Sequence, residues 1–247
     1  MEYIDKILPK KILFTSGKGG VGKSTLASAF AKTLASDGKK VLLVDFDISL
    51  RTLDIMLGLD GLVLYDWYDA VSGICDVADA IVSDEEGGPA LLPAPLLNVN
   101  VTKDQVRKMI ASIEDEYDFI ILDSPAGVGS GFEAALCTAD QAFVISTPDN
   151  VCVRSASVAA DKLAAKGIRS GLIINRFRKK TVNNGRALNI DDVIDSTGVT
   201  LIGIVPEDPK LSYSAQTGSA LDESTKGAAA VRRIIKRMYG EEIPLKI

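Results

Sequence analysis

The chain has 247 residues, of which 47% are hydrophobic and 25% are charged. These ordinary globular values exclude a disordered or collagen-like chain, and the length suits one α/β domain. We therefore expect a single domain over residues 1–247, with residues 240–247 as a short tail. The net charge of −5 gives no general attraction to polyanions, so specific recognition of nucleic acid is not expected.

The sequence contains no histidine and three cysteines, Cys75, Cys137 and Cys152. The lack of imidazole excludes most hydrolase triads, but not phosphoryl transfer, which depends on positioning and charge. The cysteines are too widely spaced for C-x-C or C-x-x-C pairs, so we expect them to be buried small hydrophobic residues. Residues 1–11 lack the apolar segment of a signal peptide, and no run approaches the roughly 18 apolar residues that cross a bilayer. These features predict a cytoplasmic protein.

Short apolar runs rich in β-branched residues recur along the chain and predict buried strands. They are residues 12–15, 41–44, 119–122, 142–146, 172–174 and 201–205. Helical spacing predicts a helix over residues 25–34 that closes at Gly38, and another over residues 228–239. Residues 83–89 and 176–186 are predicted loops. The alternation predicts an α/β fold: a mainly parallel, twisted sheet with helices on both faces, which binds ligands at the carboxyl ends of its strands.

A glycine-rich segment lies between the first predicted strand and the first predicted helix. It matches the phosphate-binding pattern G-x-x-x-x-G-K-[ST] in the structural context that this pattern requires. The glycines allow backbone N–H groups to approach phosphate oxygens, and the start of the helix adds a positive dipole end. We expect Lys23 to reach the β- and γ-phosphates and Ser24 to offer its hydroxyl to Mg²⁺. The predicted nucleotide-binding residues here are Gly17, Lys18, Gly19, Gly20, Val21, Gly22, Lys23, Ser24 and Thr25.

Lys18 is a lysine that the general pattern does not demand. It either stabilises phosphate charge, in its own site or across a subunit interface, or is a solvated surface lysine. Residues 18–24 read K-G-G-V-G-K-S, and with them the chain resembles the MinD/ParA family of ATPases, whose deviant Walker A motif has this form. The resemblance implies a P-loop NTPase fold and an ATP-dependent homodimer. It also implies catalytic roles for Lys23 and for Lys18, the latter in the partner's site.

Carboxylates follow two further predicted strands. Asp45 and Asp47 follow residues 41–44, and Asp123 follows residues 119–122. Alternate positions on a continuing strand point to the same side, so Asp45 and Asp47 are expected to face the phosphates together. A strand-terminal carboxylate behind a P-loop is the Walker B arrangement that holds Mg²⁺, although a capping role is the alternative for each aspartate taken alone. The predicted metal-site residues are Ser24, Asp45, Asp47 and Asp123.

Two segments at the ends of these strands resemble one branch of the MinD/ParA family in particular. Residues 44–54 resemble switch I of the MinD branch of the family, which determines the site of the division septum, and residues 123–127 resemble its switch II. The resemblance implies that Asp47 orients the attacking water while Asp45 and Asp123 hold the water shell of Mg²⁺. A carboxylate has limited power as a base here, so slow hydrolysis stimulated by a partner is expected.

Two strand ends in the second half of the chain predict recognition of the base. Asn175, followed by Arg176, ends the run at residues 172–174, and an asparagine pairs well with the N6 and N7 edge of adenine. Pro206 and Asp208 belong to a V-P-E-D turn that resembles the family's turn beside the adenine ring. A capping asparagine and a plain β-turn are the alternatives.

Three other segments bear on partners. Residues 147–155 resemble the MinD segment in which a helix follows near the dimer and partner surface. The basic residues between 176 and 186 are either a solvated surface or a contact for DNA, lipid or nucleotide. The family's C-terminal amphipathic membrane helix is missing after residue 240, and the basic segment 231–239 is expected to pack in the core rather than on a membrane.

The sequence thus predicts a switch that binds MgATP, dimerises, hydrolyses ATP slowly and serves intracellular positioning, with cell-division site selection as the leading role. The resemblance implies a division inhibitor and an ATPase activator as partners, and reversible association with the inner face of the cell membrane. An iron–sulfur or nickel metallochaperone ATPase is one alternative, although the cysteine spacing lacks the required pair. A DNA-partition ATPase and a flagellar-number regulator are the others.

Overall fold

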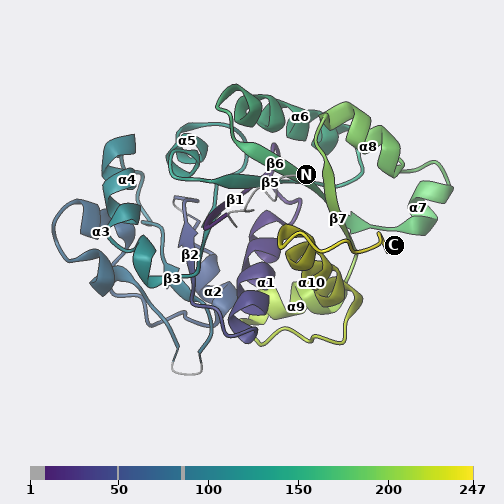
Figure 1. The fold of residues 1–247 in the computed structure, drawn as a ribbon. Coiled ribbons are helices and arrows are strands. Elements are labelled where there is room, and N and C mark those ends of the chain that lie inside the picture. Colours follow the sequence, from purple (N-terminus) through teal and green to yellow (C-terminus); the bar gives the residue numbers. More distant parts are fainter. Residues whose placement is uncertain (1–8, 49, 85–86, 247) are drawn as a thin grey trace, which may run out of the picture.

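The computed structural model describes residues 9–48, 50–84 and 87–246 (Figure 1). Ser49 of the segment that resembles switch I lies outside the described residues, as do residues 1–8, residues 85–86 of the predicted loop at 83–89, and Ile247.

Within the described residues, seven strands form one sheet in the order β3-β2-β4-β1-β5-β6-β7. All neighbouring strands run parallel, which confirms the predicted α/β class. Because β1 lies between β4 and β5, the chain leaves the middle of the sheet in both directions, and such a switch point is where open parallel sheets bind ligands. The strands are β1 (Lys11–Thr15), β2 (Val41–Asp45), β3 (Ala90–Leu92), β4 (Phe119–Asp123), β5 (Gln141–Ser146), β6 (Arg169–Phe177) and β7 (Leu201–Pro206).

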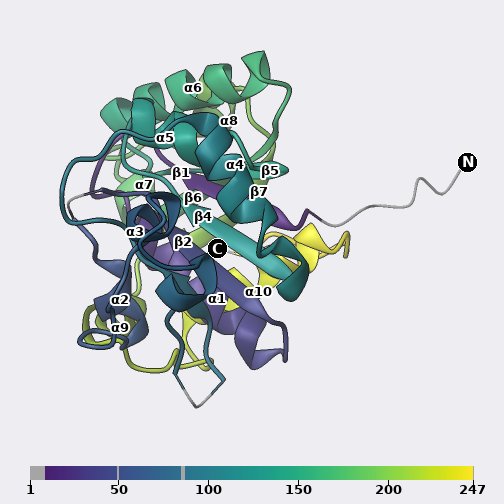
Figure 2. The same cartoon turned by 90° about the vertical axis from the view of Figure 1, so that its left-hand side faces the viewer.

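Helices cover both faces of this sheet (Figures 1 and 2). On one face α1, α9 and α10 pack together, and on the other α4, α5 and α6. Parallel strands covered on both faces need apolar side chains on both sides, which explains why they read as continuous apolar runs. The helices are α1 (Lys23–Ser36), α2 (Leu53–Leu57), α3 (Trp67–Val71), α4 (Lys103–Ala111), α5 (Ser130–Leu136), α6 (Asn150–Ala165), α7 (Lys179–Asn183), α8 (Ile190–Thr197), α9 (Pro209–Thr217) and α10 (Lys226–Met238).

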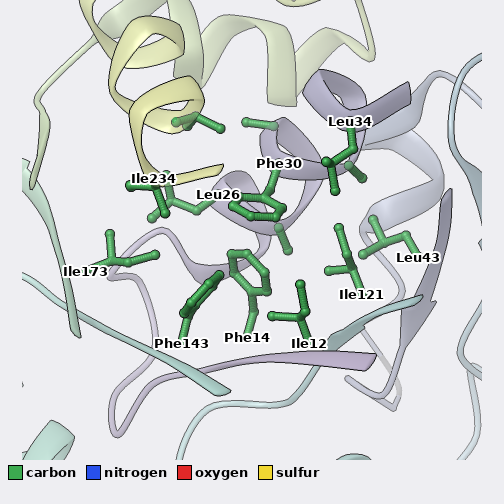
Figure 3. Packing of buried hydrophobic residues seen from close by; sticks show 14 of the residues in the cluster. Ile12, Phe14, Leu26, Phe30, Leu34, Leu43, Ile121, Phe143, Ile173 and Ile234 are labelled. Carbon is green, nitrogen blue, oxygen red and sulfur yellow. The ribbon is translucent and has the colours of Figure 1, made fainter. Parts of the chain in front are cut away.

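Three phenylalanine rings join α1 to the middle of the sheet. Phe30 of α1 lies 5.3 Å from Phe14 of β1 and 5.7 Å from Phe143 of β5, in edge-to-face geometry (Figure 3). All three side chains are fully buried. Edge-to-face pairs are favourable beyond the burial of their area, so this cluster fixes the helix that begins at the glycine-rich segment. Helix α1 ends as predicted, with Gly38 in the left-handed conformation after Asp37.

Helix α10 packs in the core, as expected for the basic segment near the end of the chain. Its apolar side chains Val231, Ile234, Ile235 and Met238 are buried against α1 and the sheet. Two of its arginines have partners: Arg232 pairs with Asp37 and Glu223, and Arg237 donates to backbone carbonyls. In the described part of the chain, no helix has the length and apolar character that crossing a membrane requires.

Three expectations are wrong or incomplete. The segment 176–186 is not simply a loop, because β6 continues to Phe177, which is buried, and α7 follows. Strand β3 was not predicted, since three residues are too few to show a period. Cys152 is buried as expected, but Cys75 and Cys137 are only partly buried; all three are free thiols.

Truncating the ring that joins α1 to the sheet is expected to destabilise the fold. Phe30→Ala removes both edge-to-face contacts and leaves a cavity, which should lower the free energy of unfolding by about 3–5 kcal/mol. Urea denaturation measures this change. Val158→Ala, at a helix position that is 48% exposed, serves as the control and should change stability by less than about 0.5 kcal/mol. Equal stability of the two variants would contradict the proposed role of the cluster.

Candidate functional site

The glycine-rich segment, residues 17–25, connects β1 to α1 at the carboxyl edge of the sheet. Gly20 and Gly22 have φ of 82° and 89°, a conformation that other residues adopt only with strain. A side chain at Gly17 would overlap the backbone carbonyl of Ser155 in α6, so this glycine allows close packing. No side chain caps the start of α1. Its first N–H groups are therefore available to an anion.

Lys23 and Ser24 meet Asp123 at the centre of the site. The Lys23 ammonium donates to Asp123 Oδ1 at 2.8 Å and to Ser24 Oγ at 3.1 Å. The Ser24 hydroxyl donates to Asp123 Oδ2 at 2.6 Å. Only 6% of the Lys23 side chain and 1% of the Asp123 side chain are exposed. The ends of β1 and β4 thus bring together three residues that the sequence assigned to phosphate and metal binding.

Asp45 lies beside Asp123, because β2 and β4 pair in register at these two residues. Its Oδ1 accepts a hydrogen bond of 2.8 Å from the backbone N–H of Asp47, whereas its buried Oδ2 has no partner among the described residues. Burial, together with the neighbouring Asp123 carboxylate, raises the pKa of Asp45 to about 8. A cation beside Oδ2 would favour the ionised form of this carboxyl group.

Asp47 is half-buried at the rim of the same site. Burial raises the pKa of its carboxyl group, the charge of Lys23 lowers it, and that of Asp123 raises it. These interactions put Asp47 in the same cluster as Lys23 and Asp123. Strand β2 ends at Asp45, so the expectation that strand geometry continues to Asp47 is wrong. Both carboxylates nevertheless interact with Lys23 and Asp123.

The oxygen atoms in this cluster suit Mg²⁺, which prefers oxygen ligands and retains several waters and phosphate oxygens. Ser24 Oγ and Asp123 Oδ2 lie 2.6 Å apart, and in the part of the chain that the structure describes the buried Asp45 Oδ2 lacks a partner. Within residues 9–48, 50–84 and 87–246, no three acidic, cysteine or histidine side chains form a complete metal-binding group. A magnesium ion here would therefore depend on water and phosphate for the rest of its ligands.

The segment that resembles switch II lies against the glycine-rich segment. Gly127 N–H donates to the Ser16 carbonyl at 2.9 Å, and Ser124 N–H donates to the Phe14 carbonyl at 3.1 Å. Lys18 is exposed, while the Ser16 hydroxyl donates to its carbonyl. Helix α6 begins after the cap Asp149, which confirms the helix expected after residues 147–149.

The residues predicted to contact the base line one pocket. Gly22, Thr25, Asn175, Arg176, Pro206, Glu207, Asp208, Leu211 and Ser212 surround it. The buried Asn175 amide donates to the Val21 carbonyl at 2.8 Å, and therefore also holds the glycine-rich segment. Asp208 caps α9 and accepts from Gly227 N–H at 2.7 Å. The predicted site residues omit Glu207, Leu211 and Ser212. Glu207 belongs to the V-P-E-D turn that resembles the family's turn, and the helical spacing of the other two from Asp208 was their only signal.

The neighbouring basic residues are mostly exposed. Arg176 has φ of 52°, in the left-handed region, and its Nε lies close to Gly22. Arg178 pairs with Glu207 at 3.6 Å, across the turn beside the pocket. A solvated surface with one weak ion pair accounts for this part of the segment.

Comparison with known proteins identifies the family. A model of an AAA domain matches residues 9–160. The septum site-determining protein MinD of Bacillus subtilis is 35% identical over an alignment of 244 positions, which covers 96% of this chain and 91% of the relative. The chain belongs to the MinD family. Its fold is also that of MinD, since the structure of a MinC:MinD cell division complex from Aquifex aeolicus matches with a TM-score of 0.89 and 37% identity, covering 96% of this chain and 98% of that one.

A second MinD structure shows a ligand. MinD from Pyrococcus horikoshii, complexed with Mg-ADP, has a TM-score of 0.81 and 26% identity, covering 92% of this chain and 95% of that one. Plasmid partition proteins share the fold at 22% identity or less.

Removing the buried ammonium is expected to prevent nucleotide binding. Lys23→Ala removes the cation nearest to Asp123 and should weaken binding of a fluorescent ATP analogue about a hundredfold or more. Lys39→Ala, at an exposed lysine just beyond α1, is the control and should bind normally. Normal binding by Lys23→Ala would contradict the assignment of the phosphate site.

Proposed function

We propose that this MinD-family ATPase is a nucleotide-dependent dimerisation switch that uses MgATP and contributes to the choice of the cell-division site. One observation carries the proposal: Lys23, Ser24, Asp45, Asp47 and Asp123 form a single cluster beside an uncapped helix start. Each side chain has the chemistry that the γ-phosphate, Mg²⁺ or the attacking water requires.

Binding begins at the glycine-rich segment. Its backbone N–H groups and the start of α1 receive the phosphates, and Lys23 exchanges Asp123 for phosphate oxygens. Asp123 and Ser24 would then be the residues that hold Mg²⁺, and Asp45 would add a carboxylate oxygen beside it. Mg²⁺ supplies neutralisation of the charge that develops on the β- and γ-phosphates.

Asp47 is the residue that we assign to the attacking water. It lies at the rim of the cluster, half-buried, where a carboxylate orients a water molecule by accepting its hydrogen bond. In a loose transition state, orientation contributes more than proton removal, so turnover by one carboxylate is expected to be slow.

Lys18 completes the site in a homodimer, according to the proposal. It lies on the exposed side of the phosphate-binding segment, next to switch II and close to the start of α6. There its ammonium can reach the phosphates of a second copy, whereas Lys23 serves those of its own chain. Two sites that share lysines in this way require ATP in both subunits, which makes assembly depend on nucleotide.

Regulatory partners follow from the same family. A MinC:MinD complex is known for the Aquifex protein, and we propose that the present chain likewise binds a division inhibitor and an ATPase activator when ATP is bound.

We place the adenine base in the pocket formed by Asn175, Arg176, Pro206 and Asp208. We do not favour the metallochaperone alternative, because the sequence lacks the C-x-C or C-x-x-C spacing of a metal-binding cysteine pair.

Removing the water-orienting carboxylate is expected to separate binding from hydrolysis. Asp47→Ala should retain ATP affinity but lower kcat about 10²–10⁴-fold, and light scattering should then show a persistent dimer in ATP. Asp60→Ala, an exposed aspartate in the same half of the chain, is the control. Full turnover by Asp47→Ala would remove this residue from its role.

We also propose a cytoplasmic location with reversible recruitment to the inner face of the cell membrane. Helix α10 is a poor candidate for the membrane anchor, because its apolar side chains are buried in the core.

Cosedimentation with anionic liposomes tests the proposed recruitment. Binding is expected with ATP and absent with ADP. It should survive Arg233→Glu in α10, since this helix faces the protein core. Failure to sediment in either nucleotide would contradict recruitment, and loss of binding in Arg233→Glu would reinstate α10 as the anchor.

A further inference from the structure

Trp67 is the chain's single tryptophan and is completely buried. It begins α3, which lies 22 residues beyond Asp45 and belongs to none of the segments that resemble the family's motifs. Its indole Nε1–H donates to the backbone carbonyl of Asp45 at 2.8 Å. The indole nitrogen has one hydrogen to donate, and this contact uses it.

The surroundings of Trp67 hold it firmly. Its backbone N–H donates to the Pro93 carbonyl at 3.1 Å, just beyond β3. Asp66 caps α3 reciprocally: its side chain accepts from the N–H groups of Tyr68 and Asp69, and the Asp69 side chain accepts from the Asp66 N–H. The Phe46 ring lies 6.0 Å from the indole. Trp67 is therefore a rigid donor, fixed by an edge strand and a helix cap.

The carbonyl that receives this bond belongs to the residue that connects strand β2 to the segment resembling switch I. On one side, Phe46 N–H donates to the Asp123 carbonyl at 2.9 Å, which continues the pairing with β4. On the other side, Trp67 holds the Asp45 carbonyl. The peptide unit between Asp45 and Phe46 therefore has hydrogen bonds at both its C=O and its N–H groups. The donor to the C=O group is Trp67, so the chain comes back to this peptide unit 22 residues after Asp45.

We infer that Trp67 is a positioning residue, whose indole–carbonyl hydrogen bond fixes the Asp45 backbone and so sets the Asp45 and Asp47 carboxylates for the metal and its waters. The inference rests on the proposed function. Asp47 N–H in turn donates to Asp45 Oδ1, which transmits the position of one residue to the next. Losing the indole bond would leave a buried carbonyl without this donor and allow the end of β2 to shift. Phosphate binding through Lys23 would be unaffected.

A single tryptophan makes an atom-level test practical. Growth of a tryptophan auxotroph on benzothienylalanine places a sulfur where the indole N–H was and changes no other residue. The probe is a fluorescent ATP analogue, titrated with and without Mg²⁺. Affinity without Mg²⁺ should be unchanged, while the Mg²⁺ concentration that gives half of the metal-dependent increase in affinity should rise about tenfold, as expected for loss of one buried hydrogen bond.

Three further proteins separate positioning from general stability. Incorporation of 7-azatryptophan retains the N–H donor and should restore the wild-type Mg²⁺ response. Trp67→Phe lacks the donor and should behave like the benzothienylalanine protein, which provides a second variant if the first does not fold. Val106→Ala truncates a buried side chain in the same apolar cluster and should lower stability without moving the Mg²⁺ midpoint.

An unchanged Mg²⁺ midpoint in the variants that lack the donor would overturn the inference, as would an equal shift in Val106→Ala. Wild-type protein that binds the nucleotide analogue with no response to Mg²⁺ would instead overturn the proposed function itself.

Discussion

The buried pair of Lys23 and Asp123 is the interaction on which the rest of the site depends. Two opposite charges lie 2.8 Å apart and almost fully excluded from water, one on the first residue of α1 and the other on the last residue of β4. Burying such a pair contributes little net stability, because desolvation offsets much of the attraction, whereas leaving either charge alone is costly. When MgATP binds, Lys23 can exchange Asp123 for a phosphate group, and Asp123 can exchange Lys23 for Mg²⁺. Neither charge is then left buried without a partner of opposite charge.

The sheet holds these charges in place through parallel pairing. Register between β2 and β4 sets Asp45 against Asp123, and the phenylalanine cluster fixes α1 and hence Lys23. Around this fixed centre lie segments with backbone hydrogen bonds within themselves or to the end of β1: residues 47–48 and 50–52 after β2, and residues 124–129 after β4. Such segments rearrange at little cost to the core, and both contact the site where the γ-phosphate is proposed to lie. Under the proposed function, a change in the phosphate is converted through these segments into a change at the exposed face of the molecule.

The sequence predicts that Lys23, Asp45 and Asp123 come together, because their signals are local and the topology of parallel sheets supplies the rest. Residues 17–25 carry a spaced pattern, and Asp45 and Asp123 each end an apolar run, so the rule that parallel strands end at one edge brings them together. Contacts between distant side chains and backbone gave no such signal. Neither the bond from Trp67 to Asp45 nor that from Asn175 to Val21 follows from the period or composition of either segment. The sequence did not predict strand β3 or helix α7, because each is too short to show a hydrophobic period.

Two copies of this chain are proposed to complete each other's sites through Lys18. An experiment that mixes two inactive variants tests this proposal most directly. Lys18→Ala and Asp47→Ala are each expected to be inactive, but in a mixed dimer the Lys18→Ala subunit retains Asp47 and receives Lys18 from its partner. One complete site then forms in each mixed dimer, so an equimolar mixture should recover about a quarter of wild-type ATP hydrolysis, because about half of freely exchanging dimers are mixed. A mixture as inactive as its components, or full activity of Lys18→Ala alone, would contradict the account.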